Sequence, residues 1–136
     1  MQTRTIKFRA WDKITDQMYN WNDIYSIHRG FKLEGDNNYS DIKLTCSMPD
    51  GSGFKPYDFE LMQYTGLKDK NGVEIYEGDV VEWSDGKLLS EVYWDQADVA
   101  FSLRCNGESW FLNDDSMLCG MEVVGNIYEN HELVDK

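Results

Sequence analysis

Two pairs of carboxylates are the features of the sequence that come closest to catalytic chemistry. Glu77 and Asp79 are separated by one residue, and Asp114 and Asp115 are adjacent. If Glu77 and Asp79 share a β-strand, their side chains lie on one face, where repulsion between like charges raises a pKa. A carboxylate-dependent hydrolase needs such groups to converge in one pocket. Because 25 of the 136 residues are acidic, such pairs also arise by chance. We therefore expect no catalytic residues and a non-enzymatic protein.

Patterns that hold metals or cofactors fail on their spacing. Residues 69–74 begin like a calcium loop, but Gly72 stands at the fourth position instead of the sixth, and the twelfth residue is Val80. The two histidines, His28 and His131, lie far apart and belong to no short His/Cys pattern. We expect no metal ion and no cofactor.

The acidic charge is unevenly distributed along the chain. The net charge is −12, yet residues 1–68 carry nine acidic and nine basic side chains. Residues 69–136 carry sixteen acidic and four basic side chains, so the whole excess lies there. Such acidity argues against nucleic-acid binding through a basic face. The acidic half is either a solvated surface or a binding face for another protein.

The sequence indicates a cytoplasmic protein with no membrane association. It contains no apolar run near the ~18 residues of a membrane span, and its first residues lack the apolar core of a signal peptide. The three cysteines, Cys46, Cys105 and Cys119, are an odd number and widely spaced. We expect them to be reduced and to lie in or near the core.

Apolar residues in the first half alternate with a period of two, which predicts β-strands. Residues 6–10 and 18–21 flank a polar segment and predict a hairpin. Further strands are expected at residues 24–27, 31–33 and 42–48, and residues 49–53 predict a loop. We assign residues 1–58 to an N-terminal β-meander or hairpin region.

The second half predicts a small SH3-like β-barrel. Residues 59–66 are apolar enough to be buried, and Asn71-Gly72, a pair that tolerates positive φ at both turn positions, predicts a tight turn. Five short strands separated by turn signals follow between Asp79 and Tyr128, and residues 129–136 can close with a helical turn. Residues 59–136 are assigned to this barrel, and the alternative is that both regions form one intertwined domain. The predicted fold is mainly β with few short helical turns.

Three blocks of the sequence resemble the YopX family of proteins encoded by phages and prophages. They are residues 8–12 (FRAWD, with Met18 after it), 61–81 (LMQYTGLKDKNGVEIYEGDVV) and 122–130 (EVVGNIYEN). Residues 22–58 and 84–121 match no fixed pattern of the family, and His131 stands where proline is expected. The resemblance implies a mainly β protein associated with mobile elements, with no assigned catalytic activity or cofactor. Homo-oligomers would fit it.

Candidate site residues follow from the middle block and from the aromatic residues of the acidic half. The middle block is interpreted as a turn that connects the two halves, or alternatively as a recognition surface, through Gln63, Tyr64, Thr65, Asp69, Asn71, Gly72, Glu77 and Asp79. Aromatic residues of the acidic half are candidates for an interface: Trp83, Trp94 and Trp110.

Three functions remain open from the sequence. The first is a non-enzymatic phage or prophage accessory protein that binds a host or phage protein or self-assembles. The second is an acidic DNA mimic that occupies the basic cleft of a host nucleic-acid-binding protein. The third is the carboxylate-dependent hydrolase, which requires the four acidic residues named above to converge.

Overall fold

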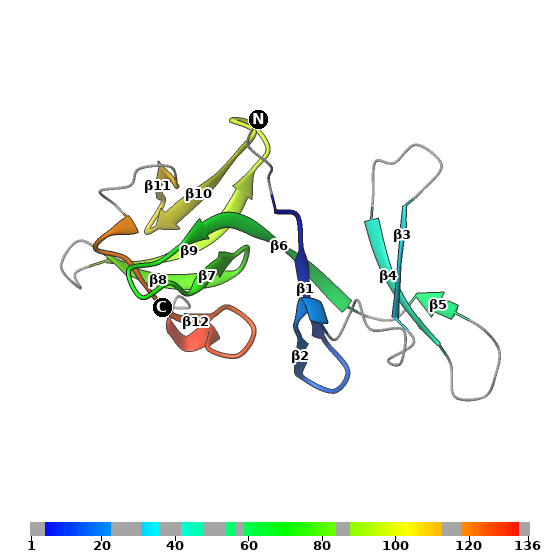
Figure 1. The fold of residues 1–136 in the computed structure, drawn as a ribbon. Coiled ribbons are helices and arrows are strands. Elements are labelled where there is room, and N and C mark those ends of the chain that lie inside the picture. The colour runs from blue at the N-terminus through cyan, green and yellow to red at the C-terminus, as the bar shows by residue number, and fades with distance from the viewer. Residues whose placement is uncertain are drawn as a thin grey trace. The chain divides into compact units, whose positions relative to one another are not determined.

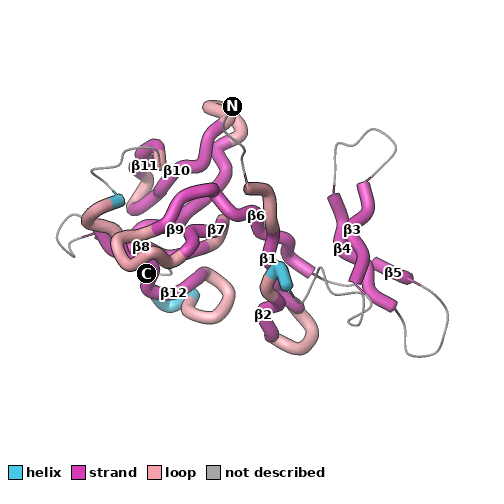
Figure 2. Tube along the Cα trace, in the orientation of Figure 1, coloured by secondary structure: helices cyan, strands magenta, loops and turns pink. Residues whose placement is uncertain are grey.

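The computed structural model describes residues 5–22, 31–35, 42–47, 54–56, 59–83, 88–112 and 118–133. Within these ranges the protein is mainly β, and helix is confined to short turns (Figure 2). One of these is a 3-10 turn, η2 (His131–Leu133), which confirms the helical turn expected near the C-terminus.

The chain divides into two compact units. One contains Lys7–Met62, and the other contains Met1–Ile6 together with Gln63–Lys136. Strand β6 (Phe59–Lys68) contributes to both units, because its first four residues belong to the one and the rest to the other. The boundary expected between residues 58 and 59 stays a prediction.

The unit Lys7–Met62 begins with the expected hairpin. β1 (Phe8–Asp12) pairs antiparallel with β2 (Gln17–Tyr19) in a sheet of order β2-β1-β6-β7. Ala10 is fully buried, and the side chains that pack against it are Tyr19, Trp21, Phe59 and Leu61. The small side chain of Ala10 leaves room for these larger groups.

A separate sheet in this unit has the order β3-β4-β5. Its antiparallel strands are β3 (Phe31–Gly35), β4 (Ile42–Ser47) and β5 (Phe54–Pro56). The first two confirm strands predicted from alternation, whereas β5 was not predicted. The strand expected at residues 24–27 and the loop at 49–53 lie outside the described residues.

The other unit holds the five strands predicted between Asp79 and Tyr128, as one antiparallel sheet of order β11-β10-β9-β8-β12 (Figure 1). They are β8 (Asp79–Trp83), β9 (Leu88–Asp95), β10 (Ala100–Cys105), β11 (Glu108–Phe111) and β12 (Glu122–Asn126). Four consecutive strands form a meander, and the last strand returns to lie beside the first. The expected turn at Asp85-Gly86 lies outside the described residues.

Alternation along these strands builds the core of this unit. The fully or nearly buried residues of the cluster are Ile75, Val81, Val92, Leu103, Leu112 and Met121. Leu103 pairs with Val92 across β10 and β9, so their side chains lie on one face of the sheet. Ile75 belongs to the short strand β7 (Glu74–Tyr76), which pairs with β6 and was not predicted from the sequence.

The two Asn-Gly pairs form different turns. Asn106 and Gly107 have φ of 52° and 83° and connect β10 to β11 as a two-residue hairpin turn with positive φ at both positions. At the other pair Gly72 has φ of 80°, but Asn71 is not in the left-handed region. The tight turn predicted at this pair is therefore confirmed, with positive φ at Gly72 and not at Asn71. The Gly72 N–H donates to the Asp69 carbonyl oxygen at 3.0 Å, so Lys70 and Asn71 form the centre of an ordinary turn.

Candidate functional site

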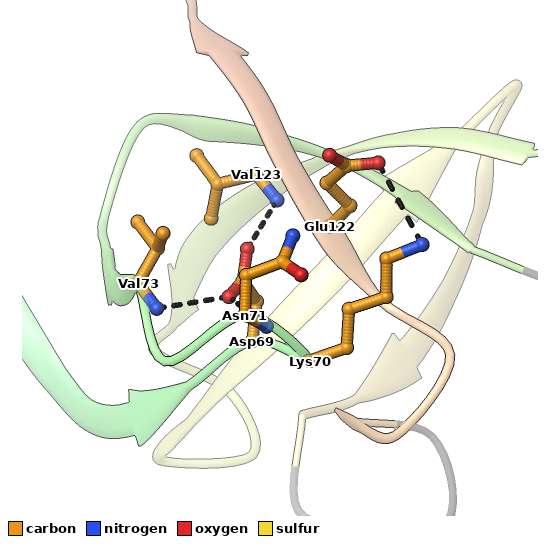
Figure 3. A network of polar contacts seen from close by, with 6 residues as sticks. All are labelled: Asp69, Lys70, Asn71, Val73, Glu122 and Val123. Carbon is orange, nitrogen blue, oxygen red and sulfur yellow. Dashed lines mark hydrogen bonds and ion pairs between the residues drawn. The ribbon is translucent and has the colours of Figure 1, made fainter.

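The carboxylate of Asp69 joins the β6–β7 loop to strand β12 (Figure 3). Its Oδ1 accepts hydrogen bonds from the backbone N–H groups of Asn71 at 2.8 Å and Val73 at 2.9 Å. Its Oδ2 accepts a third from the N–H of Val123 at 2.9 Å. The side chain is 7% exposed. We call this carboxylate and its three N–H donors the Asp69 clasp.

Lys70 adds two further contacts beside the Asp69 clasp. Its N–H donates to the carbonyl oxygen of Met121 at 2.9 Å. Its Nζ lies 3.7 Å from Oε2 of Glu122, as Figure 3 also shows. Both charged side chains are more than 40% exposed, so this ion pair contributes little to stability. The middle sequence block is therefore connected to β12 and to Met121 just before it chiefly by hydrogen bonds, which involve the Asp69 carboxylate and the Lys70 backbone.

The environment of Asp69 holds its pKa below the ordinary value. Burial by itself would raise the pKa, but the N–H donors of Val123, Val73 and Asn71, with the nearby charge of Lys70, outweigh that effect. The carboxylate is thus ionised at neutral pH, and its three hydrogen bonds are charge-assisted.

Thr65 and Gln63 stabilise the hairpin that leads into this loop. Thr65 Oγ1 donates to the carbonyl oxygen of Ile75 at 2.7 Å and accepts from the N–H of Leu67 at 3.2 Å. This bridge lies where the register of β6 and β7 shifts, between Tyr64 and Lys68. Gln63 contributes through its backbone, and the Tyr64 and Tyr76 rings pack 5.4 Å apart.

The carboxylates of Glu77 and Asp79 accept hydrogen bonds from different backbone N–H groups. Asp79 is 1% exposed, and its Oδ2 accepts from the N–H of Tyr76 at 2.8 Å. Glu77 lies in the turn before β8, and its Oε1 accepts from the N–H of Gln63 at 2.9 Å. The premise that both occupy alternate positions of one strand was therefore wrong. Asp114 and Asp115 lie outside the described residues.

Replacing Glu77 with glutamine should raise the free energy of unfolding at pH 7 by less than about 1 kcal/mol. Burial raises the pKa of Glu77, an effect partly offset by the Gln63 N–H, whereas a neutral carboxamide keeps an acceptor for that N–H. Because the pKa of Glu77 is raised in the folded state, the wild-type protein becomes more stable relative to Glu77→Gln as the pH falls. The difference in the free energy of unfolding between the two proteins should vanish below about pH 4. Urea unfolding at pH 7 and pH 4 measures both; a Glu77→Gln protein less stable at pH 7 contradicts the prediction.

Gly78 connects three segments through its backbone. Its N–H donates to the carbonyl oxygen of Val92 at 2.8 Å, and its own carbonyl oxygen accepts from the N–H of Ile127 at 2.8 Å. The residue is buried and has φ of 84°, a conformation that glycine adopts without strain. The sequence does not predict the two long-range hydrogen bonds.

The last sequence block also serves local structure. Asn126 Oδ1 accepts from the N–H groups of Tyr128 at 3.0 Å and Glu129 at 2.8 Å, which fixes the turn after β12. At Gly125, a Cβ atom would lie 2.6 Å from Oδ1 of Asn130, so the close approach of that side chain explains the glycine.

The three candidate interface tryptophans occupy two kinds of environment. Trp83 and Trp110 are half-buried, pack against the core cluster and contact each other edge to face at 5.0 Å. Trp83 Nε1 also donates to Ser90 Oγ at 2.8 Å. Trp94 is 39% exposed. Of the three, Trp94 is the most exposed.

Three further observations concern the described part of the chain. Within it, no group of three or more His, Cys, Asp or Glu side chains is arranged to hold a metal ion.

Cys105 and Cys119 are free thiols, as expected, but Cys119 is exposed, so its predicted place in or near the core was wrong. No helix in these ranges has the length and apolar character to cross a membrane.

These observations define a small, mainly β protein whose middle segment is tied to its last strand by a buried carboxylate. The chain belongs to the YopX protein family, which it matches over residues 7–135. The resemblance inferred from the three sequence blocks is thus confirmed.

Two solved structures share the fold. The yopX protein from Bacillus subtilis is 24% identical, with a TM-score of 0.59 over 96% of this chain and 98% of that one. Protein EF1440 from Enterococcus faecalis is also 24% identical, with a TM-score of 0.53 over 97% of this chain and 99% of that one. A comparison with curated proteins gives no match.

Proposed function

We propose that this protein is a cytoplasmic phage or prophage accessory protein that acts without catalysis, by binding another protein or assembling with its own copies. The observation that carries the proposal is the exposure of apolar side chains in residues 69–136, which we call the acidic unit. These side chains are Val73, Trp94, Val99, Phe111 and Val124. Aromatic residues are enriched at protein interfaces, because removing their large apolar surface from water stabilises the complex.

The use of the carboxylates supports a non-enzymatic role. Asp69 accepts hydrogen bonds from backbone N–H groups of its own loop and of β12. Glu77 accepts one from a backbone N–H of β6, and Asp79 accepts one from a backbone N–H of β7. Carboxylates in such positions stabilise turns and strand ends, which accounts for these three side chains without a catalytic role.

The order of strands supports a half-closed SH3-like barrel in this unit. The last strand, β12, pairs with the first, β8, at the end of a four-stranded meander. The same order occurs in SH3-like barrels, whose members serve many functions, so the proposed binding rests on the exposed side chains and not on the fold.

Co-purification and native mass measurement test the proposal together. The tagged chain is expressed in bacteria that carry the prophage and in bacteria that lack it, and the eluate is measured by native mass spectrometry. We expect either a stoichiometric partner or a defined homo-oligomer. A monomer that recovers no partner under either condition contradicts the proposal.

A further inference from the structure

The hairpin formed by β9 and β10 exposes an apolar patch. Trp94 is 39% exposed and Val99 is 67% exposed. Trp94 pairs with Phe101 across the two strands, and their rings contact edge to face at 5.0 Å. We call Trp94, Val99 and Phe101 the hairpin patch.

The indole of Trp94 is held in place in the absence of any partner. Its Nε1 donates to Oε1 of Gln96 at 3.0 Å, and Phe101, against which it packs, itself packs on the core cluster. A ring fixed in this way loses little conformational entropy when a partner covers it. Tryptophan in such a position has the properties of an interface anchor.

Val99 occupies a strained conformation at the tip of the same hairpin. Its φ is 51°, in the left-handed region that β-branched residues rarely adopt. The side chain is exposed, so burial within the chain does not offset the strain. Glycine or asparagine would fit the backbone better. A strained, exposed apolar residue is more easily explained by contact with a partner than by the stability of the hairpin.

The charges around the patch indicate the character of its partner. Asp95 caps the hairpin loop, because its Oδ1 accepts from the N–H groups of Ala97 at 3.0 Å and Asp98 at 3.3 Å. Asp98 is exposed. Arg104, a cation of the same hairpin, binds Glu91 Oε2 at 2.8 Å and is thereby compensated. Among the described residues no ion pair involves Asp95 or Asp98, so the hairpin presents apolar side chains next to acidic ones.

We propose that the hairpin patch is the docking site for a basic protein surface, in which an apolar pocket that receives Trp94 and Val99 is rimmed by lysine or arginine. The inference rests on the proposed function and names the partner's chemistry. Charge complementarity favours this partner over a second copy, because residues 69–136 carry sixteen acidic and four basic side chains and copies repel each other.

The test uses a synthetic peptide of alternating lysine and leucine, with glutamate–leucine and lysine–serine peptides of equal length as controls. Binding to the ¹⁵N-labelled full chain is followed by amide chemical shifts. We expect the lysine–leucine peptide to shift residues 93–101, to bind at least tenfold more tightly than either control, and to weaken as salt rises. Shifts spread evenly over the acidic unit, or equal binding of the lysine–serine peptide, overturn the proposal.

Two serine variants separate the patch from the rest of the surface. Trp94→Ser should weaken binding of the lysine–leucine peptide at least tenfold. Phe111→Ser removes another exposed ring, 50% exposed on β11, and should leave binding within twofold. Equal losses in both variants, or no loss in Trp94→Ser, overturn the assignment to the hairpin.

Replacing Val99 with glycine should raise the melting temperature by roughly 3 °C while weakening peptide binding several-fold. The substitution relieves the positive φ but removes an apolar contact with the partner. Because the variant is more stable, weaker binding cannot arise from unfolding. Thermal unfolding and the same titration give both readouts, and a stabilised variant with unchanged binding overturns the role of Val99.

Co-purification with Trp94→Ser keeps the two proposals distinguishable. If wild-type chain recovers a partner and the variant does not, both proposals are supported. If the variant recovers the same partner, or forms the same homo-oligomer, the hairpin is not the docking site, but the proposed function stands. If neither chain recovers a partner or assembles, the proposed function fails, whatever the peptide shows.

Discussion

Replacing Asp69 with alanine should lower the free energy of unfolding by about 3 kcal/mol, because three backbone N–H groups lose a charged acceptor at once. The donors are those of Asn71, Val73 and Val123. The first two hold the loop, whereas the third connects the loop to a strand 54 residues further along the chain. Loss of the carboxylate therefore affects local and long-range order together.

Urea unfolding at pH 7 measures this loss, and Asn71→Ala is its matched control. Asn71 belongs to the same loop but contributes to the Asp69 clasp through its backbone N–H, which alanine retains. Its substitution should change stability by no more than about 0.5 kcal/mol. Asp69→Asn should fall between the two, because its amide nitrogen cannot accept a hydrogen bond. Equal effects of Asp69→Ala and Asn71→Ala would show that the clasp contributes nothing.

The pH dependence of the same variants gives an independent check. Because the folded pKa of Asp69 is lowered, its contribution is fully present above the unfolded pKa of about 3.9 and is lost as the pH falls through the folded pKa. The stability difference between wild type and Asp69→Asn should therefore be largest near neutrality and shrink in acid. A difference that stays constant down to pH 2 would contradict the charge-assisted clasp.

Elements with local signals could be predicted from the sequence. The strands β8 to β12 are short segments separated by turn signals, and all five were predicted. Strand β7 is three residues long, too short to show a period, and its pairing with β6 is interrupted by a register shift. The burial of Ile75 in the core thus depends on tertiary packing that no window of the sequence contains.

In the candidate site, too, local contacts could be predicted from the sequence and long-range contacts could not. Asp69 was identified as a turn residue, and its bonds to Asn71 and Val73 are of that local kind. Its bond to Val123 depends on the return of β12 beside β8, a long-range pairing that local pattern does not specify. The tight turn at Asn71 and Gly72 was predicted from a local signal, whereas the connection of this loop to Val123 was not.

Gly78→Ala is the other substitution that we expect to have a large effect. It should lower the free energy of unfolding by about 3 kcal/mol. Alanine at φ of 84° costs about 1–2 kcal/mol by itself. Relaxation of the backbone would stretch the hydrogen bonds to Val92 and Ile127, each 2.8 Å long. The added methyl group must also fit a buried position, which adds the cost of overpacking.

Gly107→Ala separates the backbone strain of Gly78→Ala from its long-range consequences. Gly107 has nearly the same φ, 83°, but it is exposed in the β10–β11 turn, and a Cβ there meets nothing within 4 Å. Its substitution should cost about 1–2 kcal/mol, the conformational part alone. Urea unfolding of Gly78→Ala and Gly107→Ala measures the difference between their losses in the free energy of unfolding. That difference gives the combined effect of the hydrogen bonds to Val92 and Ile127 and of the crowding of the buried methyl group. Equal losses would mean that Gly78 is required for its φ and for nothing else.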